Sequence, residues 1–180
     1  MCGFSVAIIV ETVALVGLMV LLQDTMMQLI IGTILSVAFL LFQVQPIIAK
    51  MILPWFGGSA AVWNTCMLFF QLTLLGGYAY AHVVFERAKE KRQALIHITL
   101  LAGAALLLPI IPGHDWKPEG SEDPIFLILG LLGATIGLPY FILSTTGPLL
   151  QAWYAKEFQG AMPYRLFALS NVASLLALVT

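Results

Sequence analysis

The residues of this chain that could do chemistry are few, and most of them fall inside long apolar runs. Glu11 lies near the middle of the first such run, where a charged side chain costs about 2.5–3.5 kcal/mol on insertion scales. A carboxyl there could relay protons or bind an ion, or it could be protonated and hydrogen-bonded to a neighbouring helix or subunit. We favour the hydrogen-bonded form and expect Glu11 to face a polar group, because its own chain offers few partners at that depth.

Polar amides form a second group of candidates. Gln43 and Gln45 end one apolar run, and Asn64 and Thr65 begin the next. Together they could line a small polar site at the outer mouth of a helix pair. Hydrogen bonding between helices explains them equally well, at about 1 kcal/mol per contact. Asn171, in the last apolar run, belongs to the same class of buried polar or partner-contacting residues.

Two histidines are weak candidates for cofactor ligands. His82 and His97 flank a basic stretch, so a haem or chlorophyll between the two helices is geometrically conceivable. Histidines at helix ends are more often interfacial, and no Cys-x-x-Cys-His run is present, which excludes the usual covalent haem motif. The two cysteines, Cys2 and Cys66, are placed for neither a disulfide framework nor a metal site. We therefore predict no catalytic residue, no metal site and no cofactor.

The composition indicates how these side chains are positioned. Apolar residues make up 61% of the chain and charged residues 9%, against about 45–50% and about 25% in soluble domains. The net charge of −1 argues against nucleic-acid binding. A bilayer span needs about 20 mostly apolar residues. The sequence thus predicts an all-α, polytopic membrane bundle of about six transmembrane helices, at Gly3–Leu22, Met26–Gln45, Ala60–Ala81, Ala94–Ile111, Pro124–Ser144 and Tyr164–Thr180.

Basic residues predict the orientation of the bundle. The loop His82–Gln93 contains four Lys and Arg residues, whereas the loop Pro112–Asp123 contains only Lys117 beside four acidic residues. By the positive-inside rule the first loop is cytoplasmic and the second is external, which puts the N-terminus outside. We expect an integral, multi-pass protein of a bacterial inner membrane.

Two segments of the chain resemble each other at an offset of 102 residues. Both combine an apolar helix end, a proline, an amphipathic connector and a glycine, and they would have opposite membrane orientations, as in inverted three-helix repeats of transporters. The matches are few enough to arise by chance, so a true repeat and a coincidence both stay open. The matching residues are Phe39, Leu41, Pro46, Ile47, Ile48, Phe56 and Gly58 with Phe141, Leu143, Pro148, Leu149, Leu150, Phe158 and Gly160.

Small residues four apart suggest where helices pack. In lipid, small side chains let helix backbones approach closely, although glycines in a membrane helix can also be incidental. We predict that Gly133 and Gly137 face another helix rather than lipid. The candidate packing pairs are Gly77 with Ala81, Gly133 with Gly137, and Ser170 with Ser174.

The run FQVQPIIAKMILPWFGGSAAVWNTCMLFFQLTLLGGYAYAH, residues Phe42–His82, resembles the N-terminal membrane region of membrane-embedded spermidine-synthase-like proteins. Those proteins fuse transporter-like helices to an aminopropyltransferase-like domain. GLPYFILSTTGPLLQAWY (Gly137–Tyr154) and PYRLFALSNVASLLAL (Pro163–Leu178) resemble later blocks of the same family. The resemblance covers Met26–Thr180 and implies that residues 1–25 are an additional N-terminal helix.

The family's soluble domain has no counterpart here, since the longest polar stretches are far too short for a βαβ unit. We therefore expect no enzyme, but a non-enzymatic membrane subunit that packs within a larger complex. One alternative is a half-transporter with a site at the inverted-repeat interface. Another is the membrane anchor of a split spermidine-synthase-like enzyme. The expected partners are the lipid bilayer and other membrane subunits, with no nucleic acid.

Overall fold

The computed structural model describes residues 26–108, 110, 113, 116–118, 123–157 and 164–179, and across these ranges it contains helices and no strand. The predicted all-α class is therefore confirmed for the described residues. Five of the six predicted segments are helical there, so neither the six-helix count nor the inverted repeat is established. The first segment, Gly3–Leu22 with Glu11, lies outside the described residues, as does the proposed boundary at residue 25.

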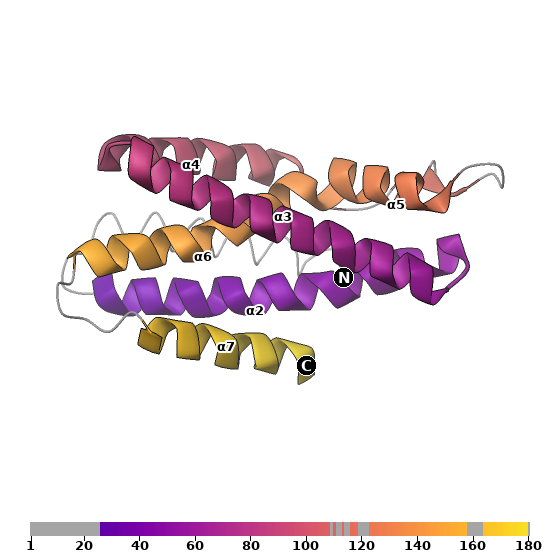
Figure 1. Ribbon diagram of the computed structural model, residues 1–180, viewed down its shortest axis with the longest axis horizontal. Coiled ribbons are helices and arrows are strands. Elements are labelled where there is room, and N and C mark those ends of the chain that lie inside the picture. Colours follow the sequence, from indigo (N-terminus) through magenta and orange to yellow (C-terminus); the bar gives the residue numbers. More distant parts are fainter. Residues whose placement is uncertain are drawn as a thin grey trace.

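The helices follow one another with short connections (Figure 1). A 3₁₀ turn, η1, follows the first described helix, and a π-helical segment, η3, joins α5 to α6 into one continuous helix. The elements are α2 (Met26–Ile52), η1 (Leu53–Phe56), α3 (Ala60–Arg87), α4 (Glu90–Leu106), α5 (Pro124–Leu132), η3 (Gly133–Gly137), α6 (Leu138–Glu157) and α7 (Tyr164–Val179).

Three of these helical stretches are long and apolar enough to cross a bilayer: Met27–Phe56, Ala60–Arg87 and Pro124–Glu157. A shorter apolar helix covers Leu166–Val179. An α-helix satisfies its backbone hydrogen bonds internally, which is what a hydrocarbon environment requires. The fold therefore indicates a multi-pass membrane protein.

The helices extend further than the apolar runs predicted. Pro46 lies inside α2 and Pro148 inside α6, whereas the sequence pattern suggested that a helix ends near each proline. Prolines are tolerated in membrane helices because neighbouring groups satisfy the freed carbonyls. The predicted basic loop His82–Gln93 is also mostly helical: α3 continues to Arg87 and α4 starts at Glu90. Charged residues can continue a helix beyond the bilayer, where water solvates their side chains.

Local sequence explains how the connections begin and end. Gly57 and Gly58 have φ values of 86° and 66°, a left-handed conformation that glycine adopts without steric cost. The Gly58 amide donates to the Leu53 carbonyl at 3.0 Å and closes the turn after η1. Ser59 then caps α3 by accepting from the Val62 amide at 3.4 Å. This turn reverses the chain between α2 and α3.

The continuous helix α5–η3–α6 is the centre of the packing. α2 packs against α7 and α6, while α3 packs against α5 and α6 and α4 against α6. In Figure 1, α2 and α3 lie close together near η1 and diverge toward the other end of the molecule. Tyr140 on α6 and Phe70 on α3 are fully buried, with ring centroids 4.9 Å apart. The interior is therefore organised around α6.

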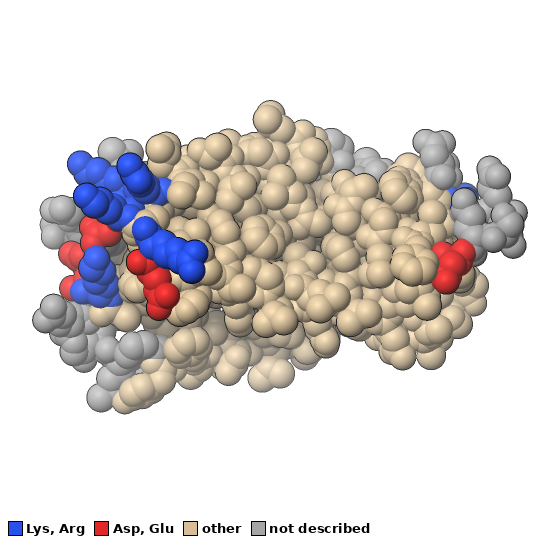
Figure 2. All heavy atoms as spheres, turned by 45° about the horizontal axis from the view of Figure 1, so that its top comes forward, with Lys and Arg blue, Asp and Glu red and all other residues tan. Residues whose placement is uncertain are grey.

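Charged side chains gather at the two ends of the bundle, and a broad uncharged zone separates them (Figure 2). We call the end where α3 meets α4 the basic end; its exposed basic residues are Arg87, Lys89, Lys91, Arg92 and Lys156. At the opposite end Lys117 lies 5.6 Å from the Trp55 ring centroid, a cation–π contact. Such a distribution suits a bundle whose middle lies in hydrocarbon and whose ends meet water.

Candidate functional site

A groove of about 610 Å³ opens between α2, α3, α6 and α7. It lies where α2 and α3 diverge, with α6 between them. Its volume falls within the range of small-molecule sites, about 300–1,000 Å³. Most of its lining is apolar, from Ile34, Val37, Ala38, Leu41, Phe42, Leu74, Ala81, Phe85, Gly147, Pro148, Ala152, Ala155 and Phe167; the polar lining residues are Tyr78, His82, Ser144, Gln151, Ser170, Asn171 and Ser174.

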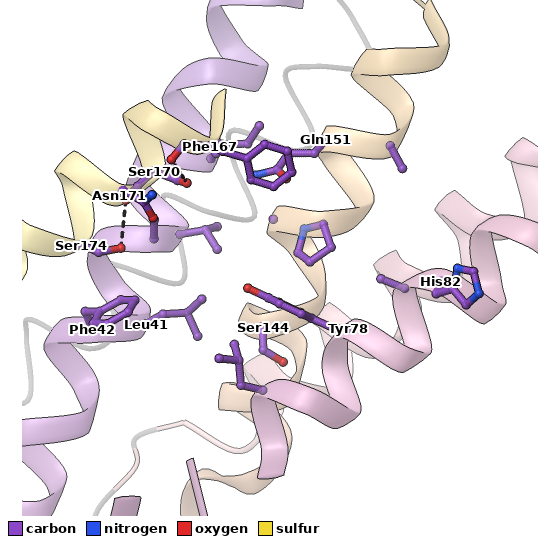
Figure 3. Close-up of a pocket in the computed structure, with 18 of the residues that line it drawn as sticks. Leu41, Phe42, Tyr78, His82, Ser144, Gln151, Phe167, Ser170, Asn171 and Ser174 are labelled. Atoms are coloured by element: carbon purple, nitrogen blue, oxygen red, sulfur yellow. Dashed lines mark hydrogen bonds between the residues drawn. The ribbon is translucent and has the colours of Figure 1, made fainter. Parts of the chain in front are cut away.

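Polar groups are concentrated on the α6–α7 side of the groove (Figure 3). The Ser170 hydroxyl donates to the Phe167 carbonyl and the Ser174 hydroxyl to the Ser170 carbonyl, both at 2.9 Å. These hydroxyls therefore offer a ligand only acceptor positions. The half-buried Gln151 and the exposed Asn171 have no hydrogen-bond partner among the described residues. Their amide groups are therefore hydrogen-bond donors without a described partner.

The groove runs along one half of the bundle. At the basic end it is lined by Phe85 on α3 and Ala155 on α6, each within two residues of a charged side chain. Its far end is lined by Ser144. With a rise of about 1.5 Å per residue, the distance along α6 from Ala155 to Ser144 is roughly 16 Å. The groove therefore extends from the basic end to about the middle of the bundle.

Close packing of α3 on α6 forms the inner wall of the groove. Gly77 is buried against Ser144: a Cβ added to Gly77 would lie 2.9 Å from the Ser144 Cβ. Ala81, one turn later, is also buried and lines the groove. The structure thus places Gly77 and Ala81 at a helix–helix contact within the chain.

The other two predicted packing pairs are placed differently. Gly133 is exposed, and no described residue lies within 4 Å of a Cβ added there, so it contacts no other helix of the described ranges and its packing stays a prediction. Gly137 faces α3: a Cβ added to it would lie 3.8 Å from the Phe69 ring, an ordinary van der Waals contact. Both glycines lie in the π-helical segment, where i→i+5 hydrogen bonding widens the turn. Residues four apart then no longer stack on one face. Ser170 and Ser174 line the groove instead.

The two histidines have different surroundings. His97 was expected at the membrane interface, but it is only 3% exposed, and its Nε2 lies 3.1 Å from the Thr146 hydroxyl. Its Nδ1 is buried without a partner in the described structure. His82 is exposed at the edge of the groove and lies 3.6 Å from Glu86. Because α4 begins at Glu90, His97 lies two turns inside the helix, and the two imidazoles do not form a facing pair.

The predicted polar site at the outer mouth does not form. Gln45 Nε2 donates to the Tyr140 hydroxyl at 2.6 Å, and the Thr65 hydroxyl donates to the Ala61 carbonyl of its own helix at 2.9 Å. Gln43 is half-buried, while Asn64 is exposed. Because α2 continues past Pro46, the α2 amides lie deeper in the bundle than Asn64 does. Among the described residues, Gln45 is the one member of this group that makes a hydrogen bond between helices.

A network at the basic end was not found from the sequence. Gln93, 3% exposed, donates to the carbonyls of Phe85 at 3.0 Å and Ala88 at 2.7 Å, and accepts from the Trp153 indole at 2.6 Å. It thereby joins the α3–α4 turn to α6. Nearby, Lys156 pairs with Glu90, and this hydrogen bond and positive charge lower the pKa of the Glu90 carboxyl. Only the tertiary fold brings these groups together, so no local motif could have indicated them.

Within the described residues, no group of three or more His, Cys, Asp or Glu side chains is arranged to hold a metal ion. Comparison with models of protein families, with curated proteins and with solved structures finds no match to this chain. The arguments about its function therefore rest on the groove, on the exposed faces of the helices and on the charges at their ends.

Proposed function

We propose that this chain is a non-enzymatic subunit of a larger membrane protein assembly. The observation that carries the proposal is a pair of exposed amides on α3. Asn64 and Gln71 are seven residues apart, which puts them on the same face of the helix, and both are exposed without a hydrogen-bond partner among the described residues. Gln71 lies about 16 Å from the start of α3 at Ala60, well inside the uncharged zone.

An amide in hydrocarbon loses hydrogen bonds to water, and a neighbouring helix can restore them. Such contacts between membrane helices contribute about 1 kcal/mol each, roughly fivefold in an equilibrium constant. A partner helix that pairs with both amides would therefore gain roughly 30-fold in affinity over one that pairs with neither. The partner we infer presents hydrogen-bonding side chains at matching depths.

The resemblance of Phe42–His82 to the membrane region of spermidine-synthase-like proteins supports this proposal. The matching run covers the last eleven residues of α2 and most of α3, the helix that bears the exposed amides. We propose that this membrane region is used here for assembly, in a chain that performs no aminopropyl transfer.

Site-specific photo-crosslinking in the native membrane tests the proposal. Leu68 lies between the two amides and is 49% exposed, whereas Leu95 on α4 is 65% exposed and serves as the control position. A photoreactive residue at position 68 should crosslink to one defined polypeptide, and one at position 95 should not. Gln71→Leu should reduce that crosslink about fivefold, while Thr99→Val, which removes an exposed hydroxyl bonded within its own helix, should leave it unchanged. Crosslinking to lipid alone at position 68 would contradict the proposal.

A further inference from the structure

We propose that the groove binds one acyl chain of an anionic phospholipid from the leaflet at the basic end. This inference does not depend on the assembly proposed above, because the groove is formed entirely by this chain. Four observations carry it: the length of the groove, its apolar lining, the donors near its mouth and the net positive charge of the end where it opens.

The length of the groove suits the glycerol ester region and the upper part of one acyl chain. The groove extends roughly 16 Å along α6 from Ala155 to Ser144, and about 10 Å of this lies beyond Gln151, within the roughly 15 Å of hydrocarbon in one leaflet. The lining along that length is mainly aliphatic and aromatic, for example Leu41, Leu74 and Phe167. Water is a poor occupant of such a lining because it would find few hydrogen-bond partners. An acyl chain fits both the length and the chemistry.

Polar groups lie at the depth where a phospholipid carries its ester carbonyls. Gln151 is one turn below Ala155, about 6 Å along α6, and Asn171 lies about 10 Å along α7 from Tyr164. Ester carbonyls only accept hydrogen bonds, and the side-chain NH₂ groups of these two amides are donors without a partner among the described residues. Gln151 and Asn171 would therefore bind the glycerol ester region.

Positive charge exceeds negative charge at the end of the bundle where the groove opens. Among the described residues, the exposed charged ones at this end are five basic ones, Arg87, Lys89, Lys91, Arg92 and Lys156, and three acidic ones, Glu86, Glu90 and Glu157, and Figure 2 shows the basic side chains gathered there. Two ion pairs occur in the described structure, His82–Glu86 and Lys156–Glu90. Arg87 and the nearby Lys89, Lys91 and Arg92 take part in neither, which leaves them available to a phosphate group. The headgroup should therefore be anionic.

Photolabelling of the purified chain in vesicles tests the inference. The probes are phosphatidylglycerol and phosphatidylcholine, each with a diazirine on one acyl chain. Phosphatidylglycerol should label peptides of α6 and α7 that line the groove, more strongly than phosphatidylcholine does. Arg87→Gln should lower the labelling by phosphatidylglycerol about fivefold and leave that by phosphatidylcholine unchanged. Equal labelling by the two lipids in the parent chain would overturn the assignment of an anionic headgroup.

Two sets of variants test the position of the acyl chain. Ala152→Trp fills the groove and should abolish labelling of its peptides, whereas Ala102→Trp adds the same side chain to an exposed position on α4 and should not. Gln151→Leu with Asn171→Leu keeps the groove open and should weaken labelling by phosphatidylglycerol. This double variant tests the proposal even if Ala152→Trp fails to fold. Labelling that is unchanged in both groove variants would overturn the proposal. Lipid extraction and mass spectrometry of the purified chain give a second test: a host isoprenoid retained in place of phospholipid would also overturn it.

Discussion

Gly77 on α3 and Ser144 on α6 lie so close together that a Cβ added to the glycine would come within 2.9 Å of the serine Cβ and 3.2 Å of its carbonyl carbon. The contact joins the two helices that form the inner wall of the groove. Its closeness depends on the missing side chain of Gly77, because backbone atoms cannot move aside as the end of a long side chain can.

We predict that Gly77→Ala destabilises the bundle by about 1–3 kcal/mol, the range for overpacking a well-packed interior. The measurement is a titration with a denaturing detergent, in which circular dichroism monitors the loss of helix. Gly76→Ala is the matched control, because its Cβ would have only an ordinary contact, 3.7 Å from Phe141. Adding Ser144→Gly to Gly77→Ala removes the nearest side-chain atoms and should restore part of the stability, because the serine carbonyl carbon stays close and a glycine inside α6 itself costs about 0.5–1 kcal/mol. If the two alanine variants unfold alike, the close contact does not determine stability.

The hydrogen bond between Gln45 and Tyr140 leads to a second prediction. Gln45 Nε2 donates to the buried Tyr140 hydroxyl at 2.6 Å, and Gln45→Leu removes this donor. The substitution should lower the free energy of unfolding by about 1–3 kcal/mol. Tyr140→Phe removes the hydroxyl itself. The double variant should lose less than the sum of the single variants, by about 1 kcal/mol. Unfolding titrations of all four proteins measure this difference, and strict additivity would show that the bond contributes nothing.

The ion pair between Glu90 and Lys156 predicts a dependence of stability on pH. The hydrogen bond and charge of Lys156 hold the pKa of the Glu90 carboxyl below its usual value of 4.5. The stabilisation is therefore fully present above the unfolded-state pKa and is lost as the pH falls through the lower, folded-state pKa. Thermal unfolding between about pH 3 and pH 7 should show a decrease in Tm on acidification that is smaller in Glu90→Gln. Glu157→Gln removes a neighbouring exposed carboxyl and should retain the full decrease.

The distribution of charge predicts the orientation of the chain in its membrane. In a background with Cys2→Ser and Cys66→Ala, an impermeant thiol reagent should label Lys117→Cys in intact cells. It should label Lys91→Cys only after the membrane is permeabilised, because the basic end is expected to be cytoplasmic. Both lysines are exposed, so access to the reagent depends on the side of the membrane. The reverse labelling pattern would show that the orientation is wrong.

The apolar runs were sufficient to locate the helices but not their ends. Length and hydropathy determine which residues lie in the hydrocarbon, whereas a helix continues wherever its backbone bonds are satisfied. α3 therefore continues through Glu86 and Arg87 beyond the apolar run, and α2 continues through Pro46. The boundaries of the hydrophobic pattern and of the secondary structure are set by different physical conditions.

The candidate site was only partly predictable. Asn171, Ser170, Ser174 and His82 are candidates in the sequence for separate reasons, and the fold brings all four to one groove. The hydrogen bonds of Gln93 could not be foreseen, since their partners are 5, 8 and 60 residues away in the sequence. The sequence indicates which polar residues are costly in lipid, but the pairing that offsets the cost depends on how helices cross.

The π-helical segment Gly133–Gly137 determines how the buried face of α5 is oriented relative to the buried face of α6. An α-helix turns by about 100° per residue, and a π turn takes up one additional residue without breaking the helix. The segment therefore sets the rotational phase between α5, which buries Ile128, and α6, which buries Tyr140. Deleting the additional residue would leave an ordinary α-helix with both buried faces in phase, whereas deleting a residue from α6 itself would rotate one half by that angle relative to the other. Its buried side chains would then point toward lipid, although none of them had been altered.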